Sequence, residues 1–145
     1  ESGRPFLGIC VGLQLLFEYS EEGEGAEGLG IFEGRVVRFA PASETGLKVP
    51  HMGWNQLQCI GDPGPENLLE YTSPNPYAYF VHSYHAVPAD TGIIRATCTY
   101  GTTFPAIIGK GHVFAAQFHP EKSQQDGIAI LRAFGNLVSG MRRVA

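Results

Sequence analysis

Apolar and polar positions alternate over much of the middle of the chain, which is the pattern of strands with one buried face. Glycine or proline punctuates the stretches that show it. The middle of the chain is therefore predicted to be rich in β-strand. The candidate strands are "GRVVRF" at 34–39, "NQLQCI" at 55–60, "YAYFVHSY" at 77–84, "GIIRATCTY" at 92–100, "PAIIGKG" at 105–111 and "HVFAAQFH" at 112–119.

The start of the chain has a different pattern. Residues 5–9, "PFLGI", are short, apolar and bounded by glycine and proline, which predicts a strand buried on both faces. In "VGLQLLFEY", residues 11–19, Leu13, Leu16 and Phe17 recur at helical spacing, so a helix is expected directly after the strand. The acidic, glycine-rich stretch at 20–30 has no periodicity and predicts a solvated loop.

The chain ends on an amphipathic pattern. In residues 123–141, Ile130, Phe134, Leu137 and Met141 form one helical stripe, which predicts a helix that covers the sheet. Ser123 and Asp126 have the spacing of a capping box at its start. Helices and strands around an apolar sheet indicate the α/β class, with residues 1–145 forming one domain.

Composition narrows the class of protein. The chain has 145 residues, 43% of them hydrophobic, and a net charge of −4 with scattered basic residues, which argues against nucleic acid or an anionic membrane as partner. Neither a membrane span nor a signal peptide is apparent, so a cytoplasmic protein is expected. Three cysteines without CxxC spacing argue against a disulfide framework or a zinc site, and Cys59 and Cys98 are expected to be buried free thiols.

Cys10 lies in the turn between the first strand and the first helix. Gly8 and Gly12 flank it, a pattern that allows a strained turn with the side chain exposed at the carboxyl end of the sheet. The helix start would favour the thiolate, and the N–H of Val11 would face a developing oxyanion. A nucleophile and a buried core thiol are both compatible with this stretch alone.

A nucleophilic cysteine requires a base. His119 precedes Pro120, which favours an extended conformation, and in an extended segment His119 and Glu121 share one face. The expected arrangement is Cys10 beside His119, with Glu121 holding the other imidazole nitrogen. Taken alone, this segment is more typical of a solvated loop after a strand than of a catalytic pair.

The two motifs together resemble a known family. "GICVGLQ" at 8–14, followed far downstream by "HPEKS" at 119–123, is similar to glutamine amidotransferase domains of the triad (class I) type. "VPHMGWNQL" at 49–57 and "YFVHSYHA" at 79–86 resemble, within it, the family of glutaminase subunits of imidazole glycerol phosphate synthases. The resemblance covers essentially the whole chain and implies a flavodoxin-like, three-layer α/β fold.

The resemblance also implies a reaction and a partner. L-Glutamine would be hydrolysed to glutamate and ammonia through a γ-glutamyl thioester on Cys10, with His119 and Glu121 completing the triad and no metal or cofactor required. The ammonia would pass to a (β/α)8-barrel cyclase subunit, which makes imidazole glycerol phosphate in histidine biosynthesis.

Further residues are assigned by the same resemblance. Gln14 would hydrogen-bond the bound glutamine, the backbone at Ser83 and Tyr84 would hold its amino-acid end, and Val11 would supply an oxyanion contact. "PHMGWN" has the composition of a core lid or of an interface, and the resemblance favours the interface. The residues expected at the cyclase are His51, Met52, Trp54, Asn55, Tyr79 and Lys122.

The resemblance fails at the start of the chain. Family members carry a P-G-x-G segment upstream of the nucleophile that supplies a second oxyanion contact, and residues 1–9 hold no such segment. Without an initiator methionine, the chain is expected to be a fragment that lacks N-terminal strands. By itself it is then expected to be poorly stable and inactive, and restoring the N-terminal part is expected to rescue both.

Three alternatives stay open. The chain could be the glutaminase of another triad amidotransferase, such as an anthranilate synthase or a pyridoxal phosphate synthase. It could also be a non-catalytic scaffolding relative. A papain-like cysteine protease is disfavoured, because such proteases are usually disulfide-bonded and lack this strand-to-helix turn.

Overall fold

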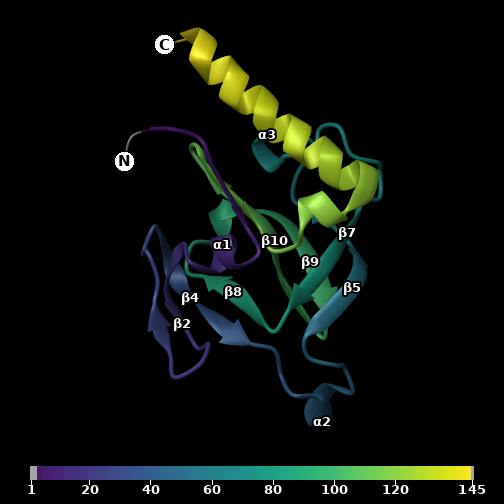
Figure 1. The fold of residues 1–145 in the computed structure, drawn as a ribbon. Helices are drawn as coiled ribbons and strands as arrows, with labels where there is room; N and C mark the ends of the chain where they lie inside the picture. Colours follow the sequence, from purple (N-terminus) through teal and green to yellow (C-terminus); the bar gives the residue numbers. More distant parts are fainter. Residues whose placement is uncertain (1–2, 145) are drawn as a thin grey trace.

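A computed structural model describes residues 3–144 (Figure 1). Three sheets form its framework: five strands in the order β1-β11-β10-β9-β6, four in the order β3-β2-β4-β8, and the pair β5-β7. The strands are β1 (Phe6–Ile9), β2 (Phe17–Ser20), β3 (Ala26–Glu27), β4 (Phe32–Arg38), β5 (His51–Gln56), β6 (Gln58–Cys59), β7 (Tyr77–His82), β8 (Tyr84–Pro88), β9 (Ile94–Tyr100), β10 (Thr102–Lys110) and β11 (Val113–Ala116). The helices are α1 (Val11–Gln14), α2 (Ala42–Thr45) and α3 (Gln124–Val144), with 3-10 turns η1 (Pro65–Asn67), η2 (Thr91–Ile93) and η3 (Pro120–Lys122).

The five-stranded sheet separates two hydrophobic clusters. Neighbouring residues of a strand point to opposite faces, so Ile107 of β10 packs in one cluster and Ile108 in the other. The first cluster includes Ile130 of α3, and the second includes Leu13 of α1 and Val36 of β4. Figure 1 shows α3 over the strands on one side, with its last turns extending beyond them. The expected α/β class and the covering helix are confirmed.

β1 is an edge strand. It pairs in parallel with β11, from Phe6 with Val113 to Ile9 with Ala116, and has no second partner among residues 3–144. Phe6 is 44% exposed. Within the described chain, the prediction of burial on both faces is therefore wrong for this residue.

The expected helix over residues 11–19 is only one turn long. It ends at Gln14, and Phe17 already begins β2. The carbonyls of Leu15 and Leu16 accept hydrogen bonds from Leu29 and from Ile31, so the chain returning from the acidic loop turns this segment into strand. Apolar spacing alone does not distinguish the two outcomes, because the deciding bonds come from residues more than ten positions away.

Two other predicted elements have different boundaries. β5 begins at His51, so "PHMGWN" is mostly strand and pairs with β7, from His51 with His82 to Gln56 with Tyr77. The stretch at 77–84 is not one strand: it breaks at Ser83, and β7 and β8 belong to different sheets. A period-two pattern continues through such a break, so the sequence does not reveal it.

The predicted capping box of α3 is not formed. The Ser123 hydroxyl accepts from the N–H of Tyr79, and the Asp126 carboxylate accepts from the N–H groups of Ser73 and Tyr77. Both side chains thus tie the helix start to β7 and its approach instead of closing the helix end. Of the predicted stripe, Ile130 is buried and Phe134 and Leu137 pack against the core, while the side chain of Met141 lies outside the described part.

None of the helices within residues 3–144 is long and apolar enough to cross a membrane.

Candidate active site

Cys10 joins β1 to α1 in a strained conformation. Its φ of 51° and ψ of −106° lie in a region that side-chain-bearing residues rarely adopt, as the glycine-flanked turn predicts. The turn leaves no space at Gly8, where an added Cβ would lie 2.7 Å from the carbonyl oxygen of Gly12. The N–H of Cys10 donates to Ala116 at 2.8 Å, so β11 holds the turn in place.

The resting thiol is not activated by its surroundings. Burial raises the pKa of Cys10, the charges of Glu121 and Glu22 add to the rise, and the amide of Val11 and the side chain of Gln117 oppose it. The expectation that the turn favours the thiolate is therefore wrong, because α1 has a single turn and half-burial outweighs its N-terminal amides. A thiolate at Cys10 thus requires a base.

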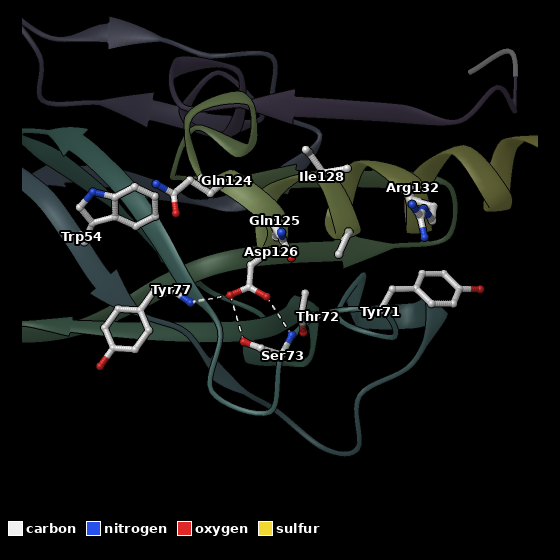
Figure 2. Close-up of a pocket in the computed structure, with 12 residues that line it drawn as sticks. Trp54, Tyr71, Thr72, Ser73, Tyr77, Gln124, Gln125, Asp126, Ile128 and Arg132 are labelled. Atoms are coloured by element: carbon white, nitrogen blue, oxygen red, sulfur yellow. Dashed lines mark hydrogen bonds between the residues drawn. The ribbon is translucent and has the colours of Figure 1, made fainter.

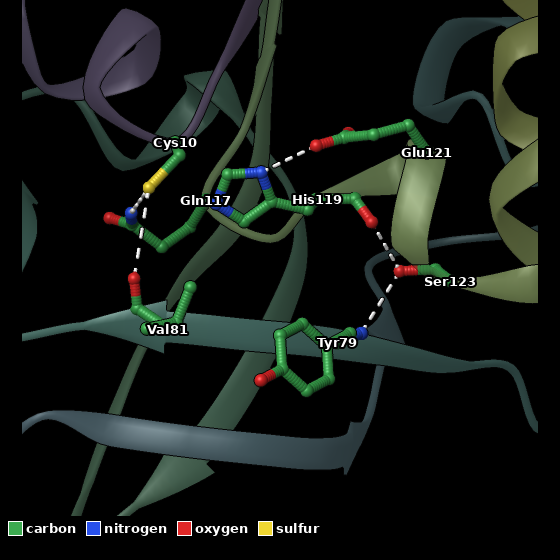
Figure 3. A network of polar contacts seen from close by, with 7 residues as sticks. All are labelled: Cys10, Tyr79, Val81, Gln117, His119, Glu121 and Ser123. Atoms are coloured by element: carbon green, nitrogen blue, oxygen red, sulfur yellow. Dashed lines mark hydrogen bonds and ion pairs between the residues drawn. The ribbon is translucent and has the colours of Figure 1, made fainter.

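His119 and Glu121 lie together as predicted. Nδ1 of His119 is 2.6 Å from Oε1 of Glu121, and the His119 side chain is 21% exposed (Figure 3). Figure 3 shows the imidazole ring between Glu121 and the side on which Cys10 and Gln117 lie. In the described structure, Cys10 and His119 share no hydrogen bond; the Cys10 sulfur instead contacts the carbonyl of Val81 and Nε2 of Gln117, both at 3.9 Å.

The backbone of His119 is held from both sides. Its N–H donates to the carbonyl of Tyr79 at 3.0 Å, and its carbonyl accepts from the hydroxyl of Ser123 at 2.7 Å. That hydroxyl accepts in turn from the N–H of Tyr79 at 2.9 Å (Figure 3). Ser123 is 1% exposed, so this closed ring of bonds holds the backbone of His119 against β7.

Only glycine fits at position 127, which lies against Ser123 of this ring of hydrogen bonds. An added Cβ would overlap the carbonyl oxygen of Pro120 and come within 2.8 Å of Cβ of Ser123. We expect Gly127→Ala to lower the free energy of unfolding by about 1–3 kcal/mol, because backbone would have to move. Unfolding in urea measures this change in free energy. Gly135→Ala is the matched control: Gly135 lies exposed on the same helix with no atom near its Cβ position. That variant should be unchanged or more stable by up to about 1 kcal/mol, and equal losses in both variants would contradict the prediction.

The predicted glutamine-binding residues lie near Cys10 but are largely engaged with one another. Nε2 of Gln14 donates to the carbonyl of Tyr84 at 3.0 Å. The same carbonyl accepts from His82, and the carbonyl of Ser83 accepts from Phe39. Oε1 of Gln14 accepts no hydrogen bond from the described residues, so this oxygen is the part of the side chain left for a ligand. Val11 is the first residue of α1, and its N–H has no partner within the helix.

The residues predicted at a partner surface fall into two groups. Met52 and Trp54, two positions apart on β5, are 62% and 48% exposed. The Trp54 ring makes an edge contact with Tyr79 at a centroid distance of 6.0 Å, and Lys122 is exposed. Asn55 is half-buried and donates to the carbonyl of Thr99.

The prediction that His51 lies at the partner surface is wrong. It is 2% exposed, and its ring stacks on Tyr100 and Phe80 at centroid distances of 4.0 and 4.9 Å. Because side chains alternate along β5, His51 faces inward together with Asn55, opposite to Met52 and Trp54. His82 and His85 are likewise buried, which agrees with a structural role.

The other cysteines lie away from Cys10. Cys98 is fully buried, and its burial raises the pKa of the thiol to about 12. Cys59 is half-buried, with its pKa also raised by burial. The prediction of free thiols is confirmed for both, and that of burial for Cys98 alone.

A cavity of about 960 Å³ lies next to Trp54, between the segment 71–77 and the start of α3 (Figure 2). The carboxylate of Asp126 bonds the loop that forms one wall, and Ile128 and Arg132 of α3 contribute to the lining. Cys10, His119 and Glu121 are not among its lining residues. The cavity is therefore separate from the cysteine site.

Gln117 is a further residue of the site, which the sequence motifs do not predict. It is fully buried, and its side chain bonds both Gln14 and Cys10. The available signal was one amide within the apolar run "VFAAQF", since a buried polar side chain needs partners.

Comparison with known proteins identifies relatives of the chain. Residues 1–136 match the family model described as glutamine amidotransferase class-I. The chain is 54% identical over 140 residues to the imidazole glycerol phosphate synthase subunit HisH of Syntrophotalea carbinolica, and 52% identical over 139 residues to that of Thermosynechococcus vestitus. These matches cover 94% and 95% of the chain but 66% and 64% of the two relatives. The chain thus spans about two thirds of their length.

The fold also matches a solved structure, that of PurLQS from Thermotoga maritima, with a TM-score of 0.66 over 94% of this chain and 63% of that one. At 19% identity, this likeness concerns the fold alone. The family expected from "GICVGLQ" and "HPEKS" is confirmed by the match over residues 1–136: the chain belongs to the class-I glutamine amidotransferase family.

Proposed function

We propose that this chain carries the glutaminase site of an imidazole glycerol phosphate synthase, with Cys10, His119 and Glu121 as its catalytic residues. The observation that carries the proposal is the strained Cys10 at the head of α1, on the same side of the fold as the 2.6 Å pair of His119 and Glu121. The identity of 54% to a HisH subunit supports this synthase over other amidotransferases.

The first half of the reaction transfers the γ-glutamyl group. His119 takes the proton of the Cys10 thiol, and the thiolate attacks the γ-amide carbon of L-glutamine. The negative charge moves to the amide oxygen, towards which the N–H of Val11 donates. His119 then gives its proton to the amide nitrogen, the carbon–nitrogen bond breaks, and ammonia leaves a thioester on Cys10.

The second half restores the enzyme. His119 removes a proton from a water molecule, whose oxygen attacks the thioester carbon. The carbon–sulfur bond breaks, glutamate leaves, and Cys10 recovers its proton from His119. Throughout, the carboxylate of Glu121 holds Nδ1 and stabilises the imidazolium.

The raised pKa of Cys10 gives His119 its importance. A thiol that is protonated at rest is protected from adventitious oxidation and alkylation. It becomes nucleophilic only when the imidazole accepts its proton, so the geometry at His119 controls the reaction.

The substrate is held by groups around the same turn. Oε1 of Gln14 would accept from the α-ammonium of glutamine, and the segment at Ser83 and Tyr84 would line its amino-acid end. With the Tyr84 carbonyl already bonded twice, its contribution would come from the remaining groups of the segment.

The product ammonia would pass to a (β/α)8-barrel cyclase that docks on the face formed by Met52, Trp54, Tyr79 and Lys122. Exposed methionine and tryptophan on one strand face are typical of protein interfaces. His51 does not belong to this face, and Asn55 would act from beneath it.

Labelling with diazo-oxo-norleucine, a glutamine analogue that alkylates the nucleophile, tests the function. With a cyclase subunit present, the reagent should modify Cys10 and spare Cys59 and Cys98 in peptide mass spectra, and glutamine should block it. Absence of labelling in a folded complex would favour a scaffolding role. Labelling supported by an anthranilate synthase or pyridoxal phosphate synthase partner instead would reassign the substrate pathway.

The partner face yields its own prediction. Trp54→Ala should weaken association with the cyclase by about thirtyfold or more, because a large exposed aromatic at the centre of an interface contributes about 2 kcal/mol or more. Titration of the cyclase by calorimetry measures the change. Tyr71→Ala, which removes a similarly exposed ring on the far side of the Figure 2 cavity, is the matched control. Equal affinity of the wild-type and Trp54→Ala proteins would place the interface elsewhere.

A further inference from the structure

The side chain of Gln117 lies between Gln14 and Cys10. Its Oε1 accepts from Nε2 of Gln14 at 3.2 Å. Its Nε2 lies 3.9 Å from the Cys10 sulfur, as Figure 3 shows. It is fully buried within an otherwise apolar run that ends β11 and leads to His119. A buried amide in such a place is costly unless its groups are paired, so its partners carry information about its role.

The orientation of this amide follows from a backbone carbonyl. The carbonyl oxygen of Tyr84 can only accept, so Gln14 must turn its NH₂ group towards it. The second hydrogen of that NH₂ group then faces Gln117, which must present its oxygen. The NH₂ group of Gln117 is therefore directed at the sulfur of Cys10.

The Tyr84 carbonyl also fixes which atoms donate and which accept in a second chain of hydrogen bonds. His82 donates from Nδ1 to Tyr84 at 2.8 Å, so its Nε2 accepts from Nδ1 of His51 at 3.0 Å. Nε2 of His51 in turn accepts from Nδ2 of Asn55 at 3.3 Å. Burial lowers the pKa of both histidines to about 4, so both rings are neutral near pH 7 and a single arrangement of protons persists.

We propose, on the basis of the glutaminase function above, that Gln117 is a positioning residue for the Cys10 nucleophile. Its NH₂ group is held towards the sulfur by Gln14 and the Tyr84 carbonyl, where it donates to the thiolate. The chain through His82 and His51 connects this carbonyl to Asn55 on β5, the strand whose outer face carries Met52 and Trp54.

Few charged groups compete with this donor. Glu121 and Glu22 act on Cys10 at longer range and disfavour the thiolate, and His119 is the base that takes its proton. The carbonyl of Val81, from β7, also faces the sulfur. The Val11 amide and the Gln117 side chain are the two uncharged groups that oppose the effect of burial.

The test is the pH dependence of Cys10 alkylation in the full-length protein. Iodoacetamide reacts with the thiolate, and peptide mass spectrometry separates Cys10 from Cys59 and Cys98. Gln117→Met replaces the amide with a side chain of similar volume that has no hydrogen-bond donor. It should raise the pH at the midpoint of the Cys10 alkylation profile by about half to one unit, which makes alkylation near pH 7 three- to tenfold slower. In glutamine hydrolysis it should lower kcat more than it changes KM, because Gln117 bonds the nucleophile directly and is linked to the proposed substrate site only through Gln14.

A second variant guards against misfolding of the first. Gln14→Met leaves Gln117 in place but removes the partner that orients it, so the midpoint should shift in the same direction by less. When Gln14→Met and Gln117→Met are combined, the shift of the alkylation midpoint should equal that of Gln117→Met alone, because Gln14 acts on the sulfur through Gln117. Gln56→Met, which removes an amide whose side-chain partner among the described residues is Asn75, is the control without a shift.

An unchanged alkylation profile in folded Gln117→Met, or additive shifts in the double variant, would overturn the proposal. Alkylation requires no glutamine, so the outcome is independent of the proposed function. A wild-type protein that hydrolyses no glutamine, yet shows the expected shifts, would refute the glutaminase function and leave the Gln117 contact standing.

Discussion

Replacing Cys10 with serine is expected to lower the rate of glutamine hydrolysis about 10⁴-fold or more. The hydroxyl is a far weaker acid than the thiol, and His119 would have to remove its proton at a site whose burial already disfavours an anion. Loss of the nucleophile removes the covalent route, and what persists comes from binding and the oxyanion contact. Glutamate release in the presence of the cyclase measures the effect.

Two variants make this result specific. Cys59→Ser changes a thiol outside the site and should keep activity within about twofold of wild type. Cys10→Gly should be as inactive as Cys10→Ser but more stable in urea, by about 1–3 kcal/mol, because glycine tolerates a φ of 51°. Activity above about 1% of wild type in Cys10→Ser would refute Cys10 as the nucleophile, and equal stability of the two variants would refute stored strain at the turn.

His119→Asn is expected to lower kcat about 10³-fold, with a smaller effect on KM. The base must accept the thiol proton, protonate ammonia and activate water, so one substitution impairs three proton transfers. The asparagine amide still fits beside Glu121, and the bonds that hold the backbone to Tyr79 and Ser123 do not involve the ring. Stopped-flow measurement of ammonia release separates the thioester-forming step from the water step.

The sizes of the losses in kcat distinguish the roles of His119 and Glu121. Glu121→Gln keeps a side chain that can accept from Nδ1 but loses the charge, so a fall of about 10- to 100-fold is expected, less than in His119→Asn. His112→Asn changes an exposed histidine at the other end of β11 and should have no effect. A Glu121→Gln loss as large as that of His119→Asn would show that the carboxylate itself transfers protons.

The chemistry of the site was readable because it is local. The strained turn at Cys10 depends on Gly8 and on a strand followed at once by a helix. The pairing of His119 with Glu121 depends on an extended segment in which residues two apart share a face. Both patterns lie within a few residues, where backbone geometry follows directly from residue type.

The electrostatics of Cys10 were not readable in the same way. The helix expected to favour the thiolate is one turn long, because the returning loop takes up the carbonyls of Leu15 and Leu16. The charges that act on the sulfur, Glu22 and Glu121, come from residues 12 and 111 positions further along the chain. A pKa depends on everything packed around the group, which no short motif specifies.

The resemblance of "GICVGLQ" and "HPEKS" to known motifs predicted the family. Residue type and short-range periodicity predicted the α/β class, the candidate triad and, in outline, the strands and the final helix. The packing of the folded chain sets the remaining features: His51 faces inward while Met52 and Trp54 face outward, Ser123 holds the backbone of His119, and Gln117 reaches Cys10. Those outcomes rest on contacts between residues 4 to 107 positions apart. Strand register and burial set such contacts, and both emerge when the whole core packs at once.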